Sequence, residues 1–281
     1  MSPAEIRDFL ERHGLAAHRS RGQNFLHDDE LADKLARLAG VGPEDAVLEI
    51  GTGLGILTRA LARHARRVVT IEIDSGLIRG LEADALLPEN VELIHADAVA
   101  LDWEPWIGGS PGPWRVVANL PYSAATPILR RLLDEGPRLA GWGVMVQREL
   151  AVRVSAEVGA RDYGSFSVLH QLCARQTGAV DLHGRCFYPV PRVVSRFVCM
   201  APRPDRPSAA ELSAVEGVVR AGFGHRRKTL ANSLRRSGRV DADQIEAACA
   251  EAGIDPSCRA QTVPPLSWLA LARAFHGGAT Q

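Results

Sequence analysis

An apolar segment that runs into a glycine-rich turn is the feature that most constrains the fold of this chain. The segment LEIGTGLGILT (48–58) starts as a short strand, passes three glycines and continues as the helical pattern GILTRALARHA (55–65). A strand that turns at glycines into a helix is typical of an α/β unit, and it lets a ligand approach the turn backbone closely.

Strand and helix patterns alternate along the first two hundred residues. Strands are expected at 46–50, 67–74, 91–98, 114–119, 142–147 and 196–202. Near the N-terminus, Asp28 or Asp29 caps an expected helix whose apolar face is Leu31, Leu35 and Leu38. The alternation predicts a doubly wound, Rossmann-like parallel sheet, with ligands beyond the carboxyl ends of its strands.

The segment APRPDRPSA (201–209) is rich in proline and charge and indicates a linker. The pattern beyond it is helical throughout. We therefore expect two domains, an α/β domain at 1–203 and a small all-helical domain at 204–281.

Composition excludes several classes of protein. No stretch of eighteen apolar residues occurs and no apolar signal region precedes residue 30, so neither a membrane span nor a signal peptide is expected. The five cysteines include no C-x-x-C pair and the histidines show no ligand spacing, so we expect no metal site and a reducing, cytoplasmic location. The net charge is zero, so any nucleic-acid binding must come from local basic patches.

Two acids follow the later strands. Glu72 lies 21 residues after Gly51, at the end of the second strand, and Asp97 ends the third. A carboxylate in this position can accept hydrogen bonds from a ribose. The G-x-G-x-G spacing differs from the G-x-G-x-x-G of dinucleotide folds, so a ligand with one ribose and no phosphate fits better. S-adenosyl-L-methionine is such a ligand; the alternative is a plain strand-to-helix turn.

The fourth strand ends in Asn119-Leu120-Pro121-Tyr122. The Asn119 side-chain oxygen and the Leu120 carbonyl can accept hydrogen bonds from an exocyclic adenine amine and make it a better nucleophile. Pro121 fixes the turn and has no N–H to compete, and Tyr122 can stack on the base. An ordinary strand-ending turn is the alternative.

In this order, the motifs resemble the rRNA adenine N6,N6-dimethyltransferases, most closely the small-subunit (KsgA/RsmA) family. The similar segments are GQNFL (22–26), EIGTGLGILT (49–58), IEID (71–74), HADA (95–98), NLPY (119–122), MVQREL (145–150), YGSFSV (163–168), FYPVPRVVS (187–195), FGHRRKTLANSL (223–234) and GIDPSCRA (253–260). The chain departs from the family pattern at Ser123-Ala124-Ala125 and at Val194, where an aspartate is common.

The resemblance implies a class I S-adenosyl-L-methionine-dependent methyltransferase that dimethylates two adjacent adenosines in the 3′-terminal hairpin loop of small-subunit rRNA. The expected partner is an assembling 30S particle, and a monomer is expected. The resemblance also places cofactor contacts on Gln23, Asn24, Leu26, Gly51, Gly53, Glu72, Asp97, Ala98 and Asn119. It makes Phe187 a second aromatic residue near the target base.

A basic segment, HRRKTLANSLRR, begins the expected RNA-binding region of the helical domain. If it is one continuous helix, Arg227 and Lys228 lie on the same side as Arg235. Arg226, Arg227, Lys228 and Arg235 are thus candidates to contact RNA phosphates. A solvated helix face is the alternative.

Two other functions remain open. A large-subunit rRNA adenine methyltransferase of the antibiotic-resistance type shares the N-terminal motifs, although RRKTLANSL and GIDPSCRA argue against it. A largely non-catalytic assembly factor could retain the fold, although the intact Glu72, Asp97 and NLPY argue against lost catalysis.

Overall fold

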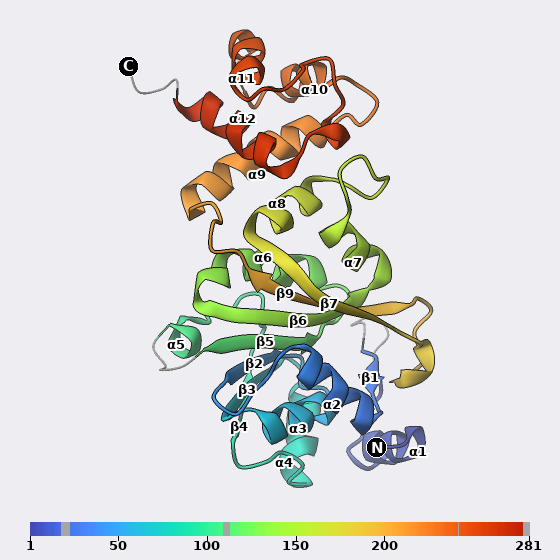
Figure 1. The fold of residues 1–281 in the computed structure, drawn as a ribbon. Coiled ribbons are helices and arrows are strands. Elements are labelled where there is room, and N and C mark those ends of the chain that lie inside the picture. Colours follow the sequence, from blue (N-terminus) through green and yellow to red (C-terminus); the bar gives the residue numbers. More distant parts are fainter. Residues whose placement is uncertain (18–22, 109–112, 241, 278–281) are drawn as a thin grey trace. The chain divides into compact units, whose positions relative to one another are not determined.

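The chain folds into two compact units (Figure 1). The computed structural model describes residues 1–17, 23–108, 113–240 and 242–277. Unit 1 comprises Met1–Ala151 and Gln176–Pro202, and unit 2 comprises Val152–Arg175 and Arg203–Gln281. The break after Pro202 lies one residue from the boundary expected at 203, but residues 152–175 group with unit 2 rather than with the α/β part. They do so because α8 (Ser165–Cys173) packs against the helices α9 (Ala209–Phe223) and α12 (Pro265–Gly277).

Unit 1 is built on a seven-stranded sheet in the order β4-β3-β2-β5-β6-β9-β7. Neighbours from β4 to β6 are parallel, whereas β9 runs antiparallel to β6. The strands are β2 (Ala46–Ile50), β3 (Arg67–Glu72), β4 (Val91–His95), β5 (Trp114–Asn119), β6 (Leu139–Gln147), β7 (Ala174–Leu182) and β9 (Ser195–Pro202). The Rossmann-like sheet is confirmed and each of the six predicted strands is present, but the prediction that the sheet is parallel was wrong for the last of them, β9.

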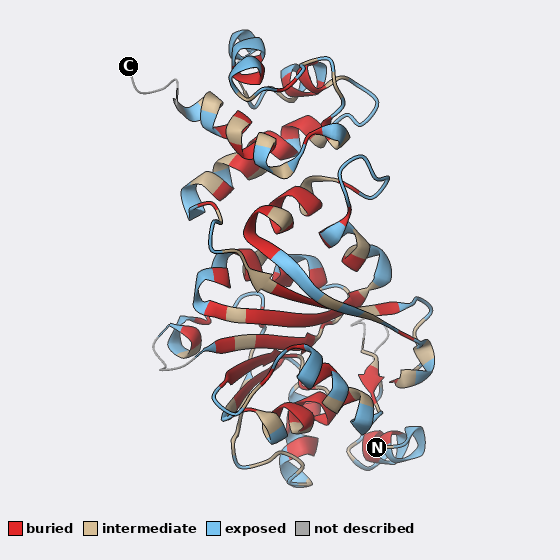
Figure 2. Ribbon diagram, viewed as in Figure 1, coloured by how far each residue is buried: buried red, intermediate tan, exposed pale blue. Residues whose placement is uncertain are grey.

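Helices cover both faces of this sheet (Figure 1). One hydrophobic cluster joins one sheet face to α1 (Pro3–Arg12), α2 (Asp29–Leu38), α3 (Ile56–His64) and α4 (Ser75–Ala83). On the other face lies α6 (Ala125–Glu135), which buries four aliphatic side chains, Ile128, Leu129, Leu132 and Leu133. The short helices α5 (Glu104–Ile107), η2 (Gly136–Arg138) and η3 (Gly184–Cys186) connect strands, and α7 (Arg148–Ser155) follows β6. In Figure 2 the central strands are red along most of their length because both faces are covered.

Two local predictions need comment. Asp28 does cap α2, and its carboxylate accepts from Leu31 N at 2.9 Å. However, Leu38 is 38% exposed, and Ala32, Leu35 and Ala36 form the buried stripe instead. Because Leu38 ends the helix, the predicted apolar face was wrong at that position.

Three strands carry no sequence pattern that predicts them. Two-residue strands β1 (Phe25–Leu26) and β8 (Phe187–Tyr188) pair antiparallel with each other, far apart in the chain. The third, β7, is an edge strand with mostly exposed, polar side chains. The β1–β8 pair ties the segment before α2 to the segment before β9.

Unit 2 is helical. Its helices are α8, α9, α10 (Leu230–Ser237), α11 (Ile245–Glu251) and α12, with the short turns η4 (Ala242–Gln244) and η5 (Ala260–Thr262). The buried Trp268 of α12 stacks on Phe223 of α9 at a ring separation of 5.5 Å. Within the described ranges, no helix combines the length and the apolar composition of a membrane span.

The basic segment of unit 2 is not one helix, which corrects the prediction. Thr229 caps α10 by accepting from Asn232 N, so the helix starts at Leu230. Arg226, Arg227 and Lys228 lie in the preceding turn, where they are exposed. A hydroxyl cap competes with helix continuation, so the expected stripe shared with Arg235 does not form on one helix face.

Candidate active site

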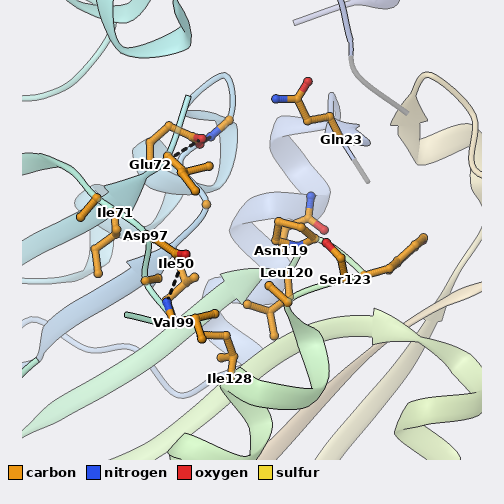
Figure 3. A pocket seen from close by; sticks show the side chains of 18 of the residues that line it. Gln23, Ile50, Ile71, Glu72, Asp97, Val99, Asn119, Leu120, Ser123 and Ile128 are labelled. Carbon is orange, nitrogen blue, oxygen red and sulfur yellow. Dashed lines mark hydrogen bonds between the residues drawn. The ribbon is translucent and has the colours of Figure 1, made fainter. Parts of the chain in front are cut away.

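A cavity of about 580 Å³ opens at the carboxyl ends of four parallel strands in unit 1 (Figure 3). Ile50 and Gly51 line it from the end of β2, and Glu72 lines it from the end of β3. Asp97 follows the end of β4, and Asn119 is the last residue of β5. This is the edge where ligands bind in open α/β sheets. The cavity brings together most of the predicted site residues, namely Gln23, Asn24, Gly51, Gly53, Glu72, Asp97, Ala98, Asn119, Leu120, Pro121 and Tyr122.

The glycine turn exposes backbone to this cavity. Gly51 and Gly53 have φ of 84° and 57°, which side-chain-bearing residues rarely adopt. A Cβ on Gly53 would lie 3.3 Å from the Phe25 ring, and one on Gly51 would lie 3.5 Å from the Asn119 carbonyl oxygen. The positive φ favours glycine at both positions, and at Gly53 the missing Cβ also lets the Phe25 ring lie close to the turn.

Glu72 is held as a fixed acceptor at the end of β3. Its Oε2 accepts from Gly53 N at 2.9 Å, and its Oε1 accepts from Ile73 N at 3.0 Å and Asp74 N at 2.9 Å. Burial raises the pKa of this carboxyl, since only 6% of the residue is exposed, and the three N–H bonds oppose the rise. These bonds use three of about four acceptor sites of a carboxylate, so Glu72 retains capacity for a ligand hydroxyl.

Asp97 and two aliphatic side chains form the next part of the wall. Asp97 Oδ1 accepts from Val99 N at 2.8 Å, which fixes the carboxylate at the end of β4 (Figure 3). Ile73 and Val99 are 57% and 42% exposed although both line the cavity. Exposed aliphatic groups beside a fixed acceptor suit a flat heterocycle with an amino group.

The Asn119 amide is oriented by a contact that sequence reasoning missed. Its Nδ2 donates to the Asn24 carbonyl oxygen at 3.1 Å. With the nitrogen committed as donor, the remaining polar atom of the side chain, Oδ1, is an acceptor. Only the spatial approach of residue 24 to the end of β5 fixes this, so no local pattern could have signalled it.

The aromatic ring of the turn is anchored as well. Tyr122 Oη is hydrogen-bonded to Ser195 Oγ at 2.8 Å, and Ser195 is only 1% exposed at the start of β9. Ser195 is a second functional contact that was not predicted, although it closes the FYPVPRVVS segment. The bond fixes the position of the ring beside Asn119.

Two predicted residues do not line the cavity. Leu26 of β1 pairs with Phe187 of β8. The exposed fraction is 3% for Leu26 and 2% for Phe187, and both residues belong to the hydrophobic cluster. Phe187 thus supports the segments that carry the site in this structure, and its predicted contact with a target base remains untested. Across the described ranges, no group of three or more His, Cys, Asp or Glu is arranged to hold a metal ion.

Beneath the glycine turn lies a buried carboxyl, Glu49 of β2. Its Oε2 accepts from Thr58 Oγ1 and Thr70 Oγ1, each at 2.6 Å, whereas Oε1 has no partner. Complete burial raises the pKa of Glu49 from 4.5 to about 8. The group is therefore largely protonated at neutral pH and differs in charge state from a solvated carboxylate.

The predicted RNA contacts lie in unit 2, and two of the four bind other groups of the protein. Arg226 Nη2 donates to the Arg161 carbonyl oxygen at 2.6 Å, and Arg235 pairs with Glu246. Both side chains remain exposed at the surface, as do Arg227 and Lys228. The geometry leaves their predicted role in binding RNA open.

A mostly parallel sheet of this order, with a glycine turn after β2 and an acid after β3, is typical of the class I S-adenosyl-L-methionine-dependent methyltransferases. The sequence model of the family "Ribosomal RNA adenine dimethylase" matches residues 14–276, and the chain belongs to that family.

Individual relatives agree with this assignment. Ribosomal RNA small subunit methyltransferase A of Rhodospirillum rubrum is 42% identical over 96% of this chain and 91% of its own length. The protein of the same name from Moorella thermoacetica is 38% identical over 98% of each chain.

Solved structures share the fold. The 23S rRNA methyltransferase ErmE is 28% identical, with a TM-score of 0.66 over 90% of this chain and 100% of its own. A dimethyladenosine transferase from Plasmodium falciparum has a TM-score of 0.74 over 90% of this chain and 98% of its own, and at 24% identity it supports the fold alone.

Replacing Glu72 by glutamine tests the ribose-acceptor role. The amide must point its NH₂ at backbone N–H groups or at the ligand, so an acceptor is lost in either orientation. We expect the Kd for S-adenosyl-L-methionine to rise at least about tenfold, as for loss of a hydrogen bond to a charged group, measured by calorimetry. The matched control is Glu92→Gln, which alters an exposed ion pair with Arg67 on the same sheet. Equal affinity of Glu72→Gln and wild type would remove Glu72 from the cofactor site.

Replacing Glu49 by glutamine tests its buried, protonated state. Between pH 4.5 and about 8 the folded wild type binds a proton that the unfolded chain has released, so folding stability falls as pH rises. Glutamine has no such proton, and the stability of Glu49→Gln relative to wild type should rise from pH 5 to pH 8. Urea unfolding at both pH values measures the difference. Parallel pH profiles would show that Glu49 is ionised in the folded protein.

Proposed function

We propose that this protein transfers methyl groups from S-adenosyl-L-methionine to N6 of two adjacent adenosines in the 3′-terminal hairpin loop of small-subunit rRNA. The observation that carries the proposal is the oriented Asn119 amide at the mouth of the cavity, next to the glycine turn. The names of the relatives, which are small-subunit rRNA methyltransferases, support the choice of RNA.

The residues of the cavity fit the cofactor. A Cβ at Gly53 would crowd the ring of Phe25, which lines the cavity, so glycine keeps this part of the turn open. Glu72 offers carboxylate oxygens to ribose hydroxyls, Asp97 offers its carboxylate to the adenine amine, and Ile73 and Val99 offer apolar surface to the adenine ring. When bound, the cofactor supplies an electrophilic methyl group on a sulfonium sulfur. Gln23, Asn24, Gly51, Gly53, Glu72, Asp97, Ala98 and Asn119 are the proposed contacts.

The NLPY turn prepares the substrate nitrogen. The lone pair of an exocyclic adenine amine is delocalised into the ring, which makes the amine a weak nucleophile. Asn119 Oδ1 and the Leu120 carbonyl accept its two hydrogens and favour a pyramidal nitrogen with a localised lone pair. With S-adenosyl-L-methionine bound, the localised lone pair would face its methyl group, and the N6 proton lost on methylation would leave to solvent. Tyr122, anchored to Ser195, supports the base by stacking.

The remaining steps are recognition and positioning. Holding the amine in line with the methyl group contributes through proximity and orientation. Arg226, Arg227, Lys228 and Arg235 of unit 2 contact RNA phosphates in this proposal, without reading sequence. The substrate is an assembling 30S particle, which places the protein in the cytoplasm, and the protein acts as a monomer.

A large-subunit target is the second candidate. The similarity to ErmE, whose title names 23S rRNA, favours it, but at lower identity than the small-subunit relatives. A largely non-catalytic role in ribosome assembly is the third candidate. It requires that the oriented Asn119 amide take no part in catalysis.

Methyl transfer to small ribosomal subunits that lack the modification tests the proposal directly. Wild type should place dimethyladenosine in the 3′-terminal hairpin, located by mapping the labelled nucleotides. Asn119→Ala removes the oriented acceptor and should slow single-turnover transfer about 100-fold or more, in the range seen when one preorganised hydrogen-bonding group is lost. The control is Asn90→Ala, which also removes a side-chain amide that donates to backbone carbonyl oxygens, those of Ala62 and Ala65, but does not line the cavity.

Other results select the alternatives. Label in large-subunit RNA would assign the protein to the second candidate. Bound subunits without methyl transfer by wild type would support the assembly role. Full activity of Asn119→Ala would contradict the proposed mechanism.

A further inference from the structure

The loop formed by residues 189–194 is held beside the catalytic turn at both of its ends. Before it, β8 pairs with β1, whose Phe25 lines the cavity. After it, Ser195 is bonded to the cavity residue Tyr122. The Val194 carbonyl also accepts from Arg148 N at 2.9 Å. All these residues belong to unit 1, so the loop has a fixed place next to NLPY.

The surface of this loop is apolar. Val190, Val193 and Val194 are 65%, 42% and 47% exposed. Within the described ranges, eight large hydrophobic residues are exposed, and these three lie within five positions of one another. Two of the other five, Ile73 and Val99, line the cavity. Exposed apolar side chains are therefore concentrated at the active site and the loop beside it, as expected for a binding surface.

Arginines flank the valines. Arg192 lies within the loop and Arg185 just before it, and both are exposed. Val190 lies over the neighbouring Gly184, because a Cβ there would be 3.0 Å from Val190 Cγ1. The nearby acid, Asp181, is already paired with Arg148 and Arg196. The loop thus has an apolar tip between two cationic residues. This arrangement is complementary to RNA, in which apolar base faces lie between negatively charged phosphates.

We infer that Val190, Val193 and Val194 form an apolar wedge that enters the RNA beside the target adenosine. The wedge covers the bases exposed when the adenosine leaves the stack for the cavity, and Arg185 and Arg192 contact the adjoining phosphates. Proteins that distort nucleic acid use aliphatic side chains for this purpose, and an extruded base must be compensated for lost stacking. This inference rests on the proposed function and adds the residues that stabilise the RNA once the target adenosine is unstacked.

The test uses small ribosomal subunits with 2-aminopurine in place of one target adenosine, because its fluorescence rises on unstacking. Wild type should raise the fluorescence on binding. The variant Val190→Ser/Val193→Ser/Val194→Ser should lose most of this rise. On unmodified subunits it should transfer methyl groups about tenfold more slowly or worse, the effect of losing part of the unstacking compensation. Its affinity for S-adenosyl-L-methionine should equal that of wild type.

Two controls separate the wedge from general effects. Isoleucine at the same three positions keeps the surface apolar and should retain both the fluorescence rise and the rate. Val158→Ser removes an exposed valine from unit 2 and should retain both as well. A serine variant with the full rate and full fluorescence rise, alongside active wild type, overturns the wedge alone. Wild type that neither methylates subunits nor raises fluorescence overturns both the wedge and the proposed function.

Discussion

The hydrogen bond from Asn119 Nδ2 to the Asn24 carbonyl is the interaction on which the account of this site depends. It joins the segment before α2 to the end of the central strand β5, and it decides which atom of the amide is left to accept. The β1–β8 pair holds the Asn24 segment in place, and the Ser195–Tyr122 bond fixes the other side of the turn. Segments distant in sequence thus preorganise one acceptor before any substrate arrives.

The sheet carries two buried glutamates whose surroundings give them different roles. Burial raises the pKa of both carboxyls. At Glu72, which faces the cavity, three backbone N–H groups oppose that rise. Glu49, next to the last residue of β2, meets two threonine hydroxyls, and its pKa is raised to about 8, which favours the neutral form. The same residue type is thus a proposed ligand acceptor at the rim and a packing group within the sheet.

Much of the fold could be predicted because burial on both faces leaves a strong pattern. The strands at 46–50 and 114–119 were predicted to the residue, and most of the NLPY and glycine-turn residues meet in one cavity. Edge strand β7 was missed because its exposed face is polar. The start of α10 was misplaced because the Thr229 cap outweighs the helical pattern of the basic residues. Residues 152–175 join unit 2 through packing of α8, which no local signal records.

A crystal structure of the protein with S-adenosylhomocysteine and adenosine would show which atoms the Asn119 amide and Glu72 offer to the ligands. We expect the ribose of S-adenosylhomocysteine on the Glu72 carboxylate, and the N6 amine of the added adenosine on Asn119 Oδ1 and the Leu120 carbonyl. The Asn119–Asn24 bond should persist in the complex. An amide turned to present its nitrogen to the adenosine, or an adenosine bound away from the NLPY turn, would contradict the account.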